Sequence, residues 1–198
     1  MKDQKGLIEY FKKNKCILRF TDILRADFHP DVLKALENKG EVVKIGRGIY
    51  SLSDTPGIES DLVRVMLQNS KGVICLISAL SFYEVTDEIP RQVNIAIRKG
   101  MRANKIVFPP VKYYKFDPKQ WETGIIEEKI EGHKIRIYSL AKTIADCFKF
   151  RNRIGMDVAM KSLKIAVNEK KINPLEILKY AKICRVERII KPLLEVII

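Results

Sequence analysis

The sequence predicts an α+β protein in which an N-terminal winged helix-turn-helix is followed by an α+β domain with a helical C-terminal tail. Three observations lead to this prediction. Three short helical patterns precede a glycine-rich hairpin, β-type alternation recurs between residues 93 and 138, and the pattern is helical from Gly155 onward. We therefore divide the chain into residues 1–55 and residues 58–198, with residues 150–198 helical.

The composition is that of a folded and strongly basic chain. Of 198 residues, 46% are hydrophobic and 31% are charged, and the formal net charge is +13. Such a charge favours a polyanionic partner through long-range attraction and counterion release. The excess is +3 over residues 1–57, +2 over residues 58–110 and +8 over residues 111–198, so charge alone does not locate a nucleic-acid site.

No segment predicts membrane insertion, export or metal binding. The longest uncharged apolar run, residues 72–82, is too short for a bilayer, and the lysine-rich N-terminus lacks the apolar core of an export signal. Cys16, Cys75, Cys147 and Cys184 lie far apart without a CxxC pair, which favours reduced and mostly buried thiols. We expect a cytoplasmic protein that uses no cofactor.

The N-terminal helices follow from local signals. Residues 3–14 carry an apolar stripe between lysines, and Thr21 is placed to cap a short helix that runs to Arg25. The segment HPDVLKALENKG begins with Pro30 at a first helical position and ends at Gly40, which suits the residue after a helix. It predicts a third helix.

A hairpin follows the third helix. Residues 42–45 and 49–52 are short β-prone runs joined by Gly46, Arg47 and Gly48. Three helices and a hairpin are the order of a winged helix-turn-helix, in which the third helix enters the major groove and the hairpin is the wing. Arg47 at the wing tip is then expected to contact phosphate or the minor groove.

Helical spacing separates a core face from an outer face on the third helix. Leu33 and Leu36 are expected to face the core, whereas Lys34 and Asn38 face outward with groups suited to base edges and phosphates. The alternative is a small domain with a solvated face, which the nearby Glu37 favours. The candidate DNA-contacting residues are His29, Asp31, Lys34, Ala35, Asn38, Lys44 and Arg47.

The second part mixes both periodicities. Expected elements are a helix over residues 59–72, a strand running into a helix over 73–87, and strands around 93–97, 112–116 and 134–138. Ser139 is placed to cap a further helix. Three apolar stripes then mark the tail: Met156, Val158, Ala159, Leu163 and Ala166; Leu175, Leu178 and Ala181; and Ile189, Ile190, Leu193, Leu194 and Ile197. We favour internal packing of the last stripe over an exposed partner-binding face.

Two basic clusters are candidate partner-binding surfaces, although each is also compatible with a solvated face. The candidates are Arg98, Lys99 and Arg102 around a loop, and Lys149, Arg151 and Arg153 at a helix end. Asp146 precedes the second cluster. Because no residue at a suitable spacing completes a nucleophile–base pair, we expect Asp146 to pair with a nearby lysine or arginine.

One constellation has the pattern of an enzyme site. Asp117, followed by Glu127, Glu128 and Lys129, matches the Asp…Glu-x-Lys order of metal-dependent nucleases. The segment WETGIIEEKIEGHK is rich in turn residues, so we expect a solvated edge there and a protein that is not an enzyme.

Three segments resemble the AbiEi-type antitoxin family of bacterial abortive-infection and toxin–antitoxin loci. They are GEVVKIGRGIYSL, ISALSFYEVTDEIPRQVNIAIRKG and KTIADCFKFRNRIGMDVAMKSL, in this order. The family's wing pattern falls on Lys44, Gly46, Arg47, Gly48 and Tyr50, and its helical signature falls on Thr143, Ala145, Asp146, Lys149, Arg151 and Arg153.

The resemblance implies a transcriptional autorepressor that binds double-stranded operator DNA through its winged helix. It also implies that the larger domain neutralises a nucleotidyltransferase-like toxin in antiviral defence. The alternative is a stand-alone protein-interaction or general nucleic-acid-binding module without a toxin partner. The oligomeric state stays open, and a monomer that binds DNA cooperatively is compatible with the sequence.

Overall fold

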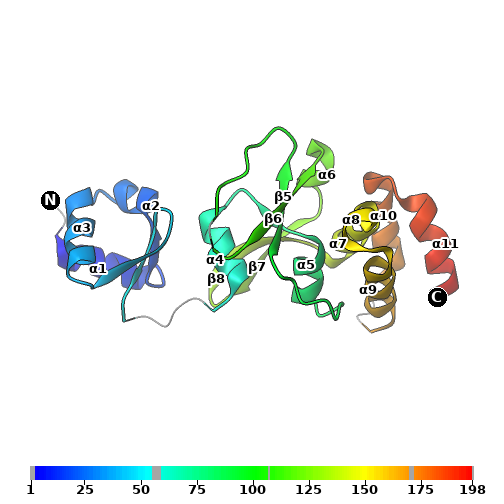
Figure 1. Ribbon diagram of the computed structural model, residues 1–198, viewed down its shortest axis with the longest axis horizontal. Helices are drawn as coiled ribbons and strands as arrows, with labels where there is room; N and C mark the ends of the chain where they lie inside the picture. The colour runs from blue at the N-terminus through cyan, green and yellow to red at the C-terminus, as the bar shows by residue number, and fades with distance from the viewer. Residues whose placement is uncertain (1–2, 55–58, 107, 170–171, 198) are drawn as a thin grey trace.

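The computed structural model describes residues 3–54, 59–106, 108–169 and 172–197. It is an α+β protein with two separate sheets (Figure 1). We call residues 3–54 the N-terminal unit and residues 59–197 the body. The boundary expected between residues 55 and 58 lies outside the described residues.

The N-terminal unit consists of three helices around a three-stranded antiparallel sheet with the order β1-β3-β2. Its elements are α1 (Gln4–Lys13), β1 (Ile17–Arg19), α2 (Phe20–Arg25), α3 (Pro30–Asn38), β2 (Val42–Gly46) and β3 (Ile49–Leu52). Leu7, Phe11, Ile23, Leu33 and Leu36 are buried between them. The three helices and the hairpin are present where the sequence predicts them, and β1 is an additional strand that was not predicted.

The prediction of Thr21 as a helix cap is wrong. Helix α2 begins two residues earlier than a Thr21 cap requires, at Phe20, and Arg19 stands at the N-cap position without a side-chain capping bond. Arg19 has an extended backbone because it is also the last residue of β1, which pairs with β3. Strand pairing therefore sets the start of this helix.

The body is built on a mixed five-stranded sheet with the order β6-β5-β4-β8-β7. Its first elements are α4 (Asp61–Gln68), β4 (Val73–Ile74), α5 (Leu76–Phe82), β5 (Val93–Arg98), β6 (Val111–Phe116), α6 (Pro118–Glu122), β7 (Ile125–Ile130) and β8 (His133–Tyr138). The β5–β6 and β4–β8 pairs are parallel, and the β4–β5 and β7–β8 pairs are antiparallel.

One expectation for this region is wrong. The first helix ends at Gln68 rather than at Gly72, because Asn69 leaves the helical conformation with φ −140°. The solvated edge expected in the turn-rich stretch is confirmed, because Glu127 and Lys129 are exposed there. The stretch contains the edge strand β7, which was not predicted and which pairs with β8. The lysine and glutamates at its centre break the alternation that identifies a strand, and β7 exists because β8 lies beside it.

Five helices complete the body: α7 (Leu140–Lys149), α8 (Arg151–Ile154), α9 (Met156–Asn168), α10 (Pro174–Cys184) and α11 (Glu187–Ile197). Ser139 caps α7 as expected, since its Oγ accepts the Lys142 N–H. Internal packing of the last stripe is confirmed, because Ile190 and Leu194 are buried in the main core. No helix in the described ranges is long and apolar enough to cross a membrane.

One residue of the second apolar stripe lies outside the core. The side chain of Leu175 is 72% exposed, because it lies in the first turn of α10 beyond the area that neighbouring helices cover. Ala181, two turns later, is fully buried.

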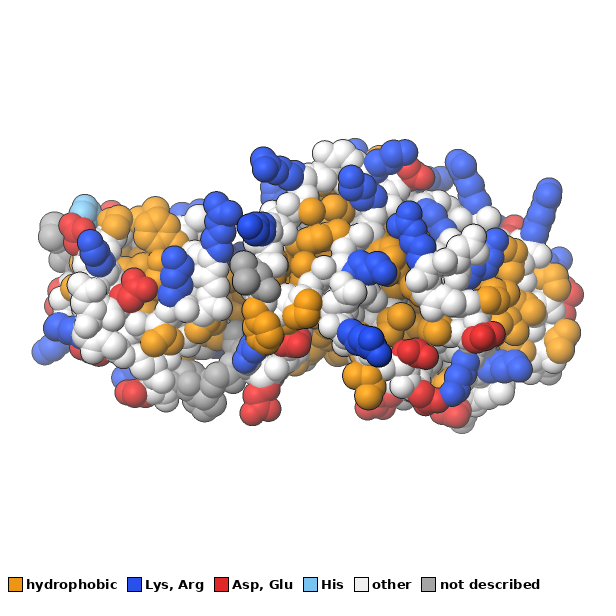
Figure 2. All heavy atoms as spheres, viewed as in Figure 1, with side chains coloured by type: hydrophobic (Ala, Val, Ile, Leu, Met, Phe, Trp, Pro, Cys, Tyr) orange, Lys and Arg blue, Asp and Glu red, His pale blue; other side chains and the backbone are white. Residues whose placement is uncertain are grey.

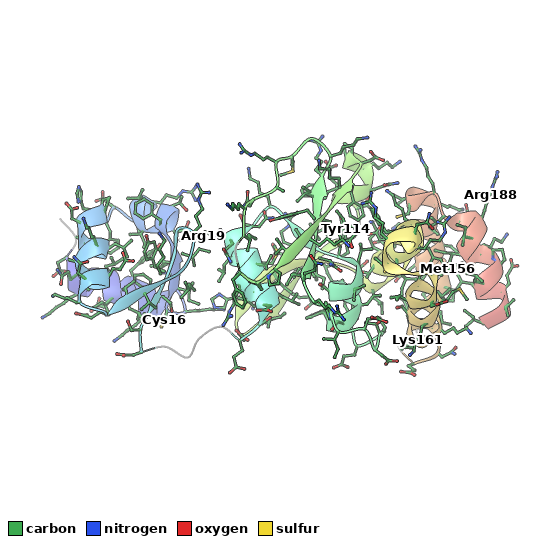
Figure 3. All side chains as sticks on the ribbon, viewed as in Figure 1. Cys16, Arg19, Tyr114, Met156, Lys161 and Arg188 are labelled. Atoms are coloured by element: carbon green, nitrogen blue, oxygen red, sulfur yellow. The ribbon has the colours of Figure 1, made fainter. Side chains whose placement is uncertain are left out.

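The N-terminal unit packs directly on the body. Ile17 and Ile49 are buried in a cluster with Val63 and Val65 of α4. Arg19 lies on the side of the unit that faces the body (Figure 3) and donates from Nε to the carbonyl oxygen of Leu67 at 2.9 Å. A cation is favourable at this place because the helix dipole is negative at the C-terminal end of α4.

Candidate nucleic-acid interface

Residues at both ends of helix α3 define where it begins and ends. His29 is its N-cap, and Nδ1 accepts the Asp31 N–H at 3.3 Å. Pro30 takes a first-turn position that needs no N–H donor, and Gly40 has φ +71° after the last turn. Leu33 and Leu36 fix its inner face.

The outer face of α3 carries exposed polar side chains. Asp31, Lys34 and Asn38 are exposed, whereas Ala35 is half-buried and contributes less surface than its expected outward position suggests. Lys34 has no ion pair with any described residue, and the Asp31 carboxylate lies 3.2 Å from His29 Nδ1. Figure 1 shows α3 on the side of the N-terminal unit that faces away from the body.

The tip of the β2–β3 hairpin points toward the body, on the side of the unit opposite α3 (Figure 1). Strands β2 and β3 are joined through Arg47 and Gly48, and Gly48 has φ +68°, which a glycine adopts without strain. A side chain added at Gly46 would lie only 3.1 Å from the Gln68 side chain, so the tip of the hairpin closely approaches the end of α4. Lys44 lies behind the tip, with Nζ 6.0 Å from the Tyr50 ring centroid.

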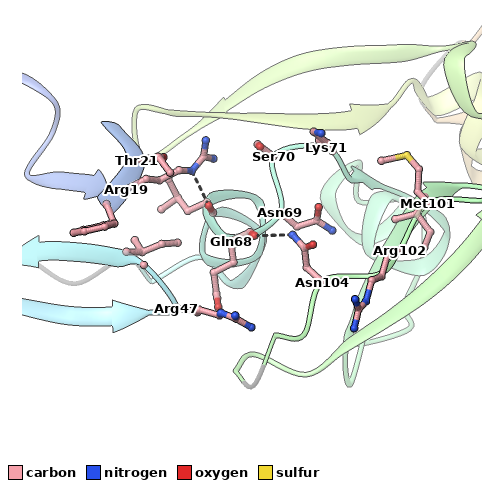
Figure 4. A pocket seen from close by; sticks show the side chains of 15 residues that line it. Arg19, Thr21, Arg47, Gln68, Asn69, Ser70, Lys71, Met101, Arg102 and Asn104 are labelled. Atoms are coloured by element: carbon pink, nitrogen blue, oxygen red, sulfur yellow. Dashed lines mark hydrogen bonds between the residues drawn. The ribbon is translucent and has the colours of Figure 1, made fainter. Parts of the chain in front are cut away.

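Arg47 therefore borders a groove between the two parts of the molecule (Figure 4). We call it the inter-unit groove, and its volume is about 630 Å³. The hairpin tip and the start of α2 form one wall, and the end of α4 and the loop after β5 form the other. Its cationic residues are Arg19, Arg47, Lys71 and Arg102, and no aspartate or glutamate lines it.

The candidate partner-binding residues lie in two different environments, the loop after β5 and the end of α7. On the loop after β5, Arg98 pairs with Glu122 at 4.0 Å and Lys99 pairs with Asp117 at 3.7 Å, whereas Arg102 faces the inter-unit groove.

At the end of α7 the cations interact with the protein itself. Lys149 is half-buried and donates to Gln120 Oε1, and burial lowers the pKa of its ammonium. Arg151 donates to the Phe148 carbonyl oxygen at 2.9 Å. Arg153 is exposed, with its guanidinium 5.8 Å from the Phe150 ring centroid.

Asp146 belongs to the core and not to a surface site. It is fully buried and accepts from Lys142 Nζ at 2.5 Å, and Cys184 Sγ lies 3.2 Å from its other oxygen. Burial raises the pKa of this carboxyl, and the Lys142 ammonium opposes that shift. The expectation that Asp146 pairs with a lysine or arginine is confirmed.

The residues of the nuclease-like pattern are not brought together. Asp117 follows β6 at one edge of the sheet, and Glu127 lies on β7 at the other edge. Glu127 pairs with Lys134 at 2.9 Å, which lowers the pKa of the Glu127 carboxyl. The described part of the chain contains no group of three or more His, Cys, Asp or Glu residues that could hold a metal ion.

Sequence reasoning missed most of the inter-unit groove. Arg19 and Lys71 carry no local signal, because one ends a three-residue strand and the other lies in a turn. Arg102 was considered only with its loop neighbours. The groove depends on packing between segments far apart in sequence.

These features define an α+β protein with an exposed polar helix and a basic groove. A crystal structure of the RV2827C protein from Mycobacterium tuberculosis is similar, with a TM-score of 0.61 and 12% sequence identity, over 89% of this chain and 70% of that chain. At this identity the likeness concerns the fold alone. No protein-family model and no curated protein matches the chain.

Proposed function

We propose that the protein is a DNA-binding transcriptional repressor whose N-terminal unit is a winged helix. The observation that carries this proposal is the exposed outer face of α3, with Lys34 and Asn38, followed along the chain by a hairpin with an exposed arginine at its tip. Three helices and a small antiparallel sheet in this order support the assignment.

The roles follow from the chemistry of the side chains. Asn38 offers an amide that can pair with adenine in the major groove, and Lys34 reaches bases or phosphates. Lys44 and Arg47 are suited to backbone phosphates or to the minor groove. Arg47 is exposed at the edge of the inter-unit groove and is therefore accessible to a phosphate.

We further propose that the body binds a protein partner, as the AbiEi-type resemblance implies. The protein would then be the autorepressing antitoxin of a nucleotidyltransferase-like toxin, in the cytoplasm, without enzymatic activity of its own. Arg153 and the loop around Arg98 and Lys99 offer exposed cations for an acidic partner surface.

A salt-titrated binding assay on DNA from upstream of the protein's own gene tests the DNA-binding role. Arg47→Ala should weaken binding to all sequences and reduce the salt slope by about one unit, because one phosphate contact is lost. Lys164→Ala removes one exposed charge from α9 and is the matched control. An Arg47→Ala protein with unchanged affinity and slope would reject the wing-tip role.

Asn38→Ala tests the reading role of α3. It should change the preference among operator variants without changing the salt slope, because an amide contacts bases and releases no counterion. Equal losses on operator and random duplexes would assign Asn38 to the backbone instead.

A second candidate is a general nucleic-acid-binding module. Figure 2 shows lysine and arginine side chains along the upper edge of the molecule, over much of the body, which favours binding without an operator. Equal affinity for operator and random duplexes at physiological salt would support this candidate.

A further inference from the structure

We propose that the inter-unit groove is a binding site for a nucleoside polyphosphate, a small ligand distinct from DNA. The proposal does not rest on DNA binding. It rests on unpaired cations, on the size of the groove and on its mixed polar and apolar lining.

Three of the cations in the groove have no acidic partner among the residues that the structure describes. Arg47, Lys71 and Arg102 line it, and none of the three has an ion pair with a described residue. Just outside the lining, Arg98 and Lys99 each face a carboxylate. Because like charges repel one another, cations that line one groove without an acidic partner favour an anion, and arginines form paired hydrogen bonds with phosphate.

Neutral groups add donors and an apolar wall. Asn69 is part of the lining, but its Nδ2 is fully buried and does not face a ligand in the groove. Ser70 and Asn104 lie nearby in the lining (Figure 4). The half-buried Phe20 and Met101 contribute apolar surface that suits the flat base of a nucleoside.

The dimensions favour a small molecule. A volume of about 630 Å³ falls within the range of small-molecule sites, roughly 300–1,000 Å³. A di- or triphosphate chain with its nucleoside places both charge and a flat apolar group inside.

Titration calorimetry on the full chain tests the proposal with two probes, ATP and inorganic pyrophosphate. Both should bind, and ATP should bind more tightly because its base adds contact with the apolar wall. Arg102→Gln should weaken both by about tenfold, as expected for one lost charge-assisted hydrogen bond. Arg102 is exposed, so this variant should fold normally, which circular dichroism checks.

Arg188→Gln is the matched control, because it removes the same exposed charge from α11, outside the groove lining. It should leave both affinities nearly unchanged. Three results would overturn the proposal: no binding of either probe, equal losses in both variants, or ATP binding no more tightly than pyrophosphate. A DNA affinity that falls in Arg102→Gln while neither probe binds would assign the groove to the duplex and would also overturn it.

Discussion

The buried pair of Lys142 and Asp146 shows how far single residues follow from sequence. That Asp146 needs a cation is predictable, because a carboxylate within an apolar helix face must be compensated. The identity of the partner, Lys142, is not predictable, because a lysine interrupts the apolar pattern of α7. Lys142 is as buried as Asp146, and its Nζ lies 4.2 Å from the Tyr138 ring centroid. Only the sheet and the helices packed around α7 bury both charges.

We expect that removing one member of this buried ion pair strongly lowers the stability of the protein. Asp146→Ala leaves the Lys142 ammonium buried and unpaired, so the free energy of unfolding should fall by about 3–5 kcal/mol. Urea denaturation of the full chain measures this loss. Asp61→Ala breaks an exposed contact with Arg64 and should cost at most about 1 kcal/mol. Similar unfolding midpoints for the two variants would contradict the assignment of Asp146 as a compensating buried charge.

At the scale of elements, local signals were sufficient where an element carries its own ends. Proline, glycine and spacing defined α3 and the β2–β3 hairpin, because those residues act on the backbone near them. Strands β1 and β7 were not predicted, because each depends on pairing with a neighbouring strand. The candidate DNA-contacting helix was therefore predictable as an element, and the inter-unit groove on the other side of the N-terminal unit (Figure 1) was not.

Helix α11 gives a prediction at the same scale. Leu194 is buried in the main core and Val196, two residues later, is 87% exposed. Leu194→Ala should lower the free energy of unfolding by about 2–5 kcal/mol, because it leaves a cavity beneath the helix. Val196→Ala should change it by less than about 0.5 kcal/mol. Equal, small effects in urea denaturation would mean that α11 contributes little to the core.

At the scale of the whole molecule, the N-terminal unit packs against the body, and the two parts share a buried cluster. Ile17 and Ile49 belong to the same cluster as residues of α4 and the large sheet, and Arg19 bonds to the end of α4. The sequence predicts Arg47 at the tip of an isolated hairpin. In the structure, the packing of the N-terminal unit on the body places Arg47 in the lining of the inter-unit groove. One arginine is then available to two proposed ligands, an operator phosphate and a nucleoside polyphosphate.

This sharing predicts that the two ligands compete. Saturating pyrophosphate should weaken operator binding, and operator DNA should weaken pyrophosphate binding by the same factor, because coupling between two sites is reciprocal. Fluorescence anisotropy of labelled operator, titrated with pyrophosphate against sodium chloride of equal ionic strength, separates competition from screening. In Arg102→Gln the curve should shift to higher pyrophosphate concentration, and in Arg188→Gln it should not. An operator affinity that follows ionic strength alone would show that the groove and the DNA-contacting surface act independently, with Arg47 serving only one of them.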